Sequence, residues 1–268
     1  MKHKLTAFAL TTLSLLSTPA WSGETAGQGS GGLAANYTDG TVDGTEKTSA
    51  AGAALRIEVD LMNVSKESLA FELGGRLRFG VASITSPSGT SQGALDIGGR
   101  IRLEGGAIFA DGCGGYFNGG VMFDAGSVAP FRSGAEVPMP QTAVARLGFG
   151  LGCLAKDSDG NVSIVATPYV GAGVSGVEVE DSETGGSLVY GGRANLMLGQ
   201  FFGIDADVGL HPDLEGKDVS VTMRVTPTEH LAVGADMRVS DRKFAEKDTS
   251  GTIDVDAVRG SLFVGGAF

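Results

Sequence analysis

The fold is decided by the stretch LDIGGRIRLEGGAIF, which occupies Leu95–Phe109. Apolar residues or glycines stand at the odd positions, and charged residues or glycines stand at the even positions up to Gly106. Side chains of a strand alternate between its two faces, so this pattern gives one apolar face and one charged face. A helix would scatter the same charges around its axis and would be weakened by the glycines. The stretch is therefore predicted to be a strand.

This strand is long enough to cross a membrane. Globular strands usually have about five or six residues, whereas a tilted transmembrane strand needs roughly 9–11. The segment Leu69–Val81 repeats the alternation, with Glu72, Arg76 and Arg78 on its polar face. Neighbouring strands with one apolar and one ionic face fit a membrane barrel, with lipid outside and a polar interior.

Alternating segments recur along the chain and predict an all-β, antiparallel, up-and-down transmembrane barrel of about twelve strands, with ten as the alternative. A weak first strand is expected at Leu33–Tyr37, after a flexible lead-in over residues 23–32. The other expected strands are Ala53–Met62, Leu69–Val81, Leu95–Phe109, Gly114–Ala125, Thr142–Leu154, Val162–Gly176, Leu188–Leu198, Phe202–Leu210, Val219–Val225, Leu231–Arg238 and Val258–Phe268. Short turns are expected at one end and longer loops at the other, for example Ile84–Gly93, Glu178–Ser187 and Asp241–Thr252.

The N-terminus predicts export. A basic start at residues 2–4, an apolar core over Leu5–Leu16 and the small-x-small triplet Ala20-Trp21-Ser22 are typical of a signal peptide over residues 1–22. Residues 23–268 are then expected to form one barrel domain. The formal net charge of −11 argues against nucleic acid as a partner.

The chain resembles Gram-negative outer-membrane β-barrel proteins as a class. The resemblance covers most of the exported chain and is sharpest at the ending Leu262–Phe268. Barrels of this class end in an aromatic residue that the barrel-assembly machinery reads, which assigns that role to Phe268. The resemblance implies location in the outer membrane, with outer-membrane lipids and the assembly machinery as partners.

The two cysteines are expected to face each other. A turn centred on Ser133 would place Phe117 opposite Phe149, Val121 opposite Ala145, and Cys113 opposite Cys153. Cysteines opposite on neighbouring strands are within bridging reach, and an exported chain meets an oxidising compartment. A disulfide between Cys113 and Cys153 is therefore predicted.

The predicted inward faces carry arginines and carboxylates in near balance, and two hypotheses follow. Such side chains can form a constriction that sorts small polar solutes or ions by charge, as in a porin-like passive channel. They can instead form a ladder of salt bridges that closes a structural or adhesive barrel. The channel is the preferred hypothesis. Its lumen residues are Arg56, Glu58, Asp60, Glu72, Arg76, Arg78, Asp96, Arg100, Arg102, Glu104, Arg146, Arg193, Asp205, Asp207, Arg224, Asp236, Arg238 and Arg259.

Catalysis finds little support in the sequence. After the signal the histidines are His211 and His230, and His211 is interpreted as a loop residue. Neither a serine–histidine–carboxylate arrangement nor a set of metal ligands emerges. No enzymatic activity, cofactor or metal is expected. Asp218 is grouped with the acidic residues of the outer loops.

Overall fold

The computed structural model describes residues 24–43, 46–64, 69–107, 113–130, 141–156, 162–178, 182–199, 201–245 and 252–267. The strands within them are β1 (Glu24–Val42), β2 (Glu46–Val64), β3 (Leu69–Thr85), β4 (Ser91–Ala107), β5 (Cys113–Pro130), β6 (Gln141–Lys156), β7 (Val162–Glu178), β8 (Ser182–Leu198), β9 (Phe202–His211), β10 (Gly216–Thr228), β11 (Leu231–Ala245) and β12 (Thr252–Ala267).

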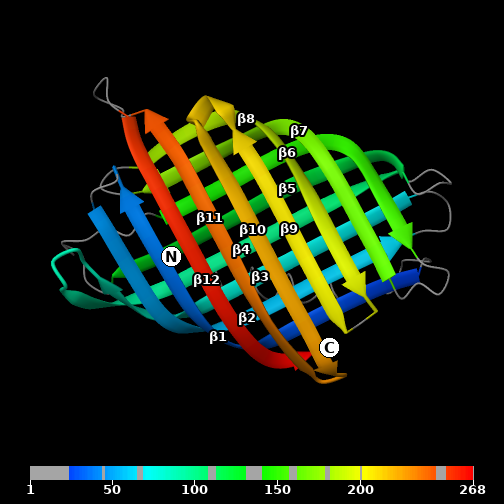
Figure 1. Cartoon of the computed structure of the whole chain (residues 1–268), viewed down its shortest axis with the longest axis horizontal. Helices are drawn as coiled ribbons and strands as arrows, with labels where there is room; N and C mark the ends of the chain where they lie inside the picture. Colours follow the sequence, from blue (N-terminus) through cyan, green and yellow to red (C-terminus); the bar gives the residue numbers. More distant parts are fainter. Residues whose placement is uncertain are drawn as a thin grey trace, which may run out of the picture.

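The strands close into an up-and-down barrel. Each pairs antiparallel with its neighbours in the chain, and β1 closes the ring by pairing with β12 from Ser30↔Ala267 to Val42↔Val255. In Figure 1 the strands β9–β12 cross steeply in front of β2–β4. The expected architecture and the count of twelve are confirmed for the described residues.

The two faces of the wall differ as the alternation predicts. Along β2 the exposed fractions run Leu55 61%, Arg56 2%, Ile57 48% and Glu58 6%. Large apolar side chains are likewise exposed on the outside of other strands, including Phe79, Val170, Val208 and Leu262. Exposure of so large an apolar surface to water would be unfavourable, whereas contact with the acyl chains of lipids is favourable. The chain is an outer-membrane β-barrel.

The first strand is much longer than its sequence signal. Residues 24–32, expected as a flexible lead-in, belong to β1 and pair with β2 from Glu24↔Val64 onward. Backbone pairing with β2 along its whole length, and with β12 from Ser30 onward, holds this glycine-rich segment, whose small side chains give little hydrophobic alternation. The prediction of a short strand at Leu33–Tyr37 is therefore wrong in extent.

Most of the expected long loops are strand instead. β7 continues to Glu178, β8 already begins at Ser182, and β11 continues to Ala245. A five-residue turn over Ser86–Thr90 joins β3 to β4, closed by Ser86 N donating to Thr90 O at 2.9 Å. Polar strand ends beyond the lipid need no apolar face, so hydrophobic alternation does not reveal them.

The connection between β9 and β10 is short and lies at the same end of the barrel as the turn between β3 and β4. It turns through a 3-10 helix, η1 (Pro212–Leu214), with Glu215 in the left-handed conformation at φ 44°. Leu214 is buried against Gly185 of β8, and Asp213 accepts a 2.8 Å hydrogen bond from Leu188 N. No helix in the described ranges is long and apolar enough to cross a membrane.

The register of β5 and β6 agrees with the expectation at one end and departs from it at the other. Cys113 lies opposite Cys153 and Phe117 opposite Phe149. An irregularity between Asn118 and Met122 then shifts the pairing, so Ala145 faces Phe123 and not Val121. The shift reflects a local bulge, which a symmetric turn does not anticipate. The signal peptide and Phe268 lie outside the described residues.

Tyr169 on β7 shows why one glycine is required. A Cβ at Gly191 would lie 2.5 Å from the Tyr169 hydroxyl and ring and 2.3 Å from Val208 O. The tyrosine ring therefore lies over the glycine, and its hydroxyl donates to Val208 O at 3.3 Å. The glycine leaves room for the inward ring of Tyr169 to lie over β8 and for its hydroxyl to reach β9.

The disulfide between Cys113 and Cys153 remains a prediction, and its test is direct. Because the two Cα positions are paired, we expect no free thiol in the folded protein without reductant and two after reduction. Alkylation followed by mass spectrometry counts them. A Cys153→Ser variant is the control and should show one thiol; two free thiols in the unreduced protein would contradict the bridge.

A cation on the lipid-facing surface should destabilise the barrel. Leu55 is 61% exposed near the middle of β2, so Leu55→Arg is expected to lower the free energy of unfolding by about 2–4 kcal/mol in vesicles. Ser83→Arg, at an exposed position near the end of β3, is the control and should change it by about 1 kcal/mol or less. Equal effects would argue against a lipid belt at Leu55.

Candidate functional site: the ion pairs of the lumen

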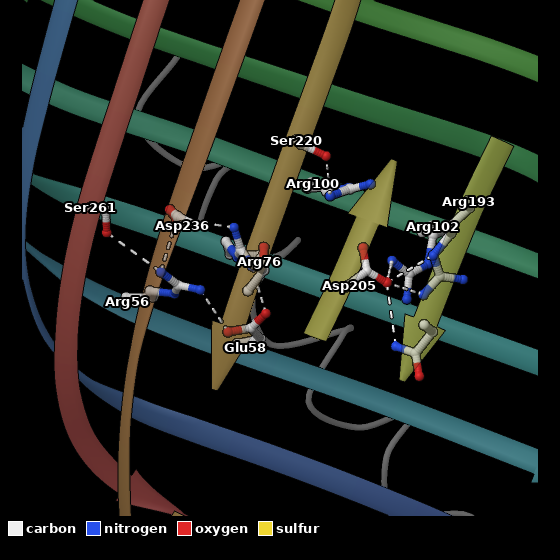
Figure 2. Close-up of polar contacts among 12 residues, drawn as sticks. Arg56, Glu58, Arg76, Arg100, Arg102, Arg193, Asp205, Ser220, Asp236 and Ser261 are labelled. Atoms are coloured by element: carbon white, nitrogen blue, oxygen red, sulfur yellow. Dashed lines mark hydrogen bonds and ion pairs between the residues drawn. The ribbon is translucent and has the colours of Figure 1, made fainter. Parts of the chain in front are cut away.

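A cluster around Asp236 joins two parts of the wall through the lumen. Asp236 on β11 accepts hydrogen bonds on Oδ1 from Arg56 of β2 at 3.0 Å and from Arg76 of β3 at 3.2 Å (Figure 2). The same two guanidiniums hold Glu58, at 2.8 Å from Arg56 and 2.7 Å from Arg76. Arg76 also donates to the Thr222 hydroxyl of β10 at 3.0 Å. We call Arg56, Glu58, Arg76 and Asp236 the Asp236 cluster.

An aromatic ring supports this cluster from β12. The Arg56 guanidinium lies 3.9 Å from the centroid of Phe263, a cation–π contact. Phe263 in turn covers Gly234, where a Cβ would lie 2.3 Å from the ring. The ring therefore fixes the position of Arg56 between its two carboxylates.

A second cluster spans the barrel from β4 to β9. Asp205 of β9 accepts hydrogen bonds from Arg102 of β4 at 3.2 Å and from Arg193 Nε of β8 at 2.8 Å. Asn195 of β8 lies at 3.4 Å from the same oxygen. Because β4 and β9 are far apart around the ring, Arg102 reaches Asp205 across the interior. We call Arg102, Arg193, Asn195 and Asp205 the Asp205 cluster.

Two further contacts also cross the lumen. Arg100 of β4 donates to the Ser220 hydroxyl of β10 at 3.4 Å and lies 3.7 Å from Asp207 of β9. Asp96 of β4 receives Asn36 of β1 at 2.9 Å and pairs with Arg78 of β3 at 3.0 Å. Opposite parts of the wall therefore touch at several levels.

A third cluster, centred on Asp218 of β10, lies near the η1 end. His211 Nε2 is 2.9 Å from Asp218 Oδ2, Arg242 donates to the same oxygen, and Arg238 lies 3.7 Å from Oδ1. His211 and Arg242 are almost completely buried. The assignments of His211 and Asp218 to outer loops are therefore wrong, because β9 and β10 extend further than the apolar alternation indicates.

A small cavity adjoins the Asp236 cluster. Its volume is about 60 Å³, and its lining includes Gly98, Gly99, Ser220 and Thr222. The charged part of the lining consists of Arg76, Arg78, Arg100, Asp236, Arg238 and Arg259. Guanidinium groups are therefore the commonest charged groups in the lining, and Arg78, Arg100 and Arg238 pair with carboxylates outside it.

Apolar side chains occupy the interior toward both ends. At the η1 end, Ala50, Ile84 and Ala94 form one buried group, and Phe244 packs with Val255 in another. At the end that holds the strand termini Glu24 and Ala267, Ala34 and Ala232 pack with Phe263. The Asp236 and Asp205 clusters thus lie between these apolar groups, and the Asp218 cluster lies nearer the η1 end.

The structure brings most of the predicted lumen residues together. Those whose side chains face inward are Arg56, Glu58, Arg76, Arg78, Asp96, Arg100, Arg102, Arg193, Asp205, Asp207, Arg224, Asp236, Arg238 and Arg259. The side chains of Asp60, Glu72, Glu104 and Arg146 lie outside the described part. Sequence reasoning missed His211, Asp218 and Arg242 as lumen residues. The available signal was the period of two, which places Asp218 on the same face as Ser220 and Arg242 on the same face as Ser240.

Three carboxylates at the surface could approach a cation. Asp241, Asp254 and Asp256 offer oxygens within 4.8 Å of one another on β11 and β12. Lys217 pairs with Asp241 at 3.5 Å and supplies a competing positive charge. Exposed acidic groups of this kind are common, so we assign them no function.

The similarity of this chain to known proteins is to solved structures. No protein-family model and no curated protein matches the chain. Among solved structures, the transport unit of the autotransporter AIDA-I from Escherichia coli is 13% identical, with 98% of this chain and 97% of that chain covered and a TM-score of 0.44. The translocator domain of autotransporter NalP from Neisseria meningitidis is 11% identical, with coverage of 96% and 94% and a TM-score of 0.43.

A third similar structure is the toluene transporter TodX of Pseudomonas putida, 11% identical, with 96% of this chain and 93% of that chain covered and a TM-score of 0.35. Likeness at this level carries no information about activity. The outer-membrane assignment of this chain rests on its own closed barrel and exposed apolar belt.

Loss of the Asp205 charge should destabilise the barrel. Asp205→Asn leaves Arg102 and Arg193 facing a neutral group in a largely water-excluded site, so we expect the free energy of unfolding to fall by about 3 kcal/mol. Urea unfolding in detergent or vesicles measures it. Glu229→Gln, the same change in an exposed turn, should leave stability within about 0.5 kcal/mol of the parent. An equally small effect of Asp205→Asn would contradict the cross-barrel contact.

Proposed function

We propose that this outer-membrane β-barrel is a narrow, non-enzymatic channel for small polar solutes or ions, held closed at rest by the ion pairs of its lumen. The observation that carries the proposal is the contact of Asp236 on β11 with both Arg56 of β2 and Arg76 of β3 through the lumen, across strands that are not neighbours in the ring. This closure consists of side chains, which rotate without any change in the backbone ladder.

The chemistry of the closure favours a path that can open. Guanidiniums and carboxylates that separate are readily hydrated, whereas an apolar plug would resist water. The inward glycine at position 98 also keeps the wall thin beside the cavity, of whose lining it forms part. Movement of the Arg76 side chain away from Asp236 would join the cavity to the space beyond the Asp236 cluster.

A closed, non-conducting structural or adhesive barrel is the second candidate. The short contacts of the Asp236 cluster, 2.7–3.2 Å, and the apolar groups toward both ends of the lumen favour it. Buried ion pairs with several hydrogen bonds hold their geometry well, because a broken pair leaves a charge without its partner. The two candidates differ in whether weakening the Asp236 cluster produces current.

Single-channel recording in planar bilayers separates them. We expect rare, small openings in the parent protein. Asp236→Asn should raise the open probability about tenfold or more, because a charge-assisted hydrogen bond contributes roughly 1.5–3 kcal/mol. Arg76→Gln weakens the same contact from the opposite side and should act in the same direction.

Glu229→Gln is the matched control, since it removes one carboxylate from an exposed turn, and its currents should equal those of the parent. Folding of each variant is checked by its resistance to unfolding in cold detergent. Silent bilayers with correctly folded parent, Asp236→Asn and Arg76→Gln proteins would overturn the channel and support the closed barrel.

A further inference from the structure

We propose that Arg224 is a reserve partner of Asp236, which forms an ion pair with Asp236 when the Arg76 side chain moves away from it. The inference rests on the proposed function, because it explains how Asp236 stays compensated while the lumen is open. The exchange itself involves three inward side chains, and it can be measured without any current.

Arg224 on β10 is a buried arginine whose guanidinium has no ion-pair or hydrogen-bond partner among the described residues. The residue is 8% exposed, and its Nη1 is shielded from solvent without donating a hydrogen bond. A buried charge without a counter-charge is costly. The side chain therefore gains stability as soon as a carboxylate comes within reach.

The register of the wall places two carboxylates next to Arg224. Thr222, the next inward residue of β10, lies opposite Asp205 of β9 and opposite Asp236 of β11. Arg224 itself lies opposite a glycine on each side, so each of these carboxylates is its diagonal neighbour. Diagonal neighbours on paired strands are about 7–8 Å apart, a separation that a long side chain spans.

Asp236 is the carboxylate of the two whose partner can leave. Its partner Arg76 has a side chain that is 20% exposed, whereas its other partner, Arg56, is 2% exposed. The two guanidiniums that hold Asp205 are 6% and 1% exposed. Arg76 therefore moves with the smallest loss of packing, and its movement leaves Asp236 with one guanidinium.

The carboxylate of Asp236 has an oxygen available for a further donor. Arg56 and Arg76 both donate to Oδ1, at 3.0 and 3.2 Å, and within the described ranges Oδ2 accepts no hydrogen bond. Both oxygens of an ionised carboxylate are acceptors, so Arg224 can bind Oδ2 while Arg56 stays on Oδ1. Opening then exchanges one ion pair of Asp236 for another.

The residues beside Arg224 permit this movement. Its opposite residue on β11 is Gly234, so no side chain of β11 stands between Arg224 and Asp236. The Phe263 ring of β12 lies over this glycine, and a guanidinium packs favourably on an aromatic ring. Rotation of the Arg224 side chain toward Asp236 therefore needs no change in the backbone ladder.

Urea unfolding in vesicles tests the exchange. In the parent protein, Arg224→Gln removes a guanidinium without a partner, so the equilibrium constant for unfolding should fall or rise by less than about threefold. In the Arg76→Gln variant, the same change removes the replacement partner of Asp236 and should raise that constant about tenfold or more. Arg224→Lys keeps a positive charge and should stay within about threefold of Arg76→Gln alone.

Asp236→Asn identifies the partner of Arg224. When Arg76→Gln is combined with Asp236→Asn, the further change Arg224→Gln should alter the unfolding constant by less than about threefold, because the carboxylate is gone. Lys217→Gln removes a positive charge from the outer face of the same strand, and its effect should be equally small with and without Arg76→Gln. Equal effects of Arg224→Gln in the parent and in Arg76→Gln would overturn the exchange, as would a tenfold effect that persists with Asp236→Asn.

Single-channel recording separates failure of the exchange from failure of the channel. Arg224→Gln should shorten the mean open time of the parent about tenfold, because the open lumen loses an ion pair. The tenfold effect on unfolding together with silent bilayers would retain the exchange and reject conduction. Currents without that effect on unfolding would retain the channel and reject the exchange.

Discussion

Charges that face the inside of a narrow barrel must find partners there, and this requirement shapes the whole interior. An arginine of β3 and an aspartate of β11 compensate each other at 3.2 Å, although their strands are separated by β12, β1 and β2 around the ring. The carboxylates of Asp205 and Asp236 are each compensated by more than one guanidinium. The ion pairs therefore connect parts of the wall that the backbone ladder does not join directly.

The same alternation that turns charges inward turns apolar side chains outward. Residues such as Leu55 and Ile57 lie exposed on either side of buried Arg56. A membrane makes both faces stable at once, because lipid covers the first and neutralisation across the lumen stabilises the second. Membrane location and lumen chemistry thus follow from one strand pattern.

The sequence was sufficient for the fold class and for most inward-facing residues, because a period of two is read residue by residue, as for Arg100 and Arg102 on β4. It failed where hydrophobicity stops alternating. Glycine-rich β1 and the polar ends of β7, β8 and β11 are held by backbone pairing, which leaves little side-chain signal. His211, Asp218 and Arg242 were missed because they lie in the polar ends of β9, β10 and β11.

Partners across the lumen could not be predicted from the sequence. Which carboxylate meets Arg76 depends on the tilt of the strands and on the shape of the closed ring, since the two residues are 160 positions apart. Register irregularities such as the one between Asn118 and Met122 also depend on tertiary packing. The candidate site could therefore be predicted as a set of residues but not as an arrangement.

A double-mutant cycle on Arg76 and Asp236 tests most directly whether opposite parts of the wall touch. Free energies of unfolding are measured in vesicles for the parent, Arg76→Gln, Asp236→Asn and the double variant. A contact at 3.2 Å predicts a coupling energy of roughly 0.5–3 kcal/mol. Effects of the two single changes that add to within about 0.3 kcal/mol would show that the lumen is not bridged there and would contradict the account.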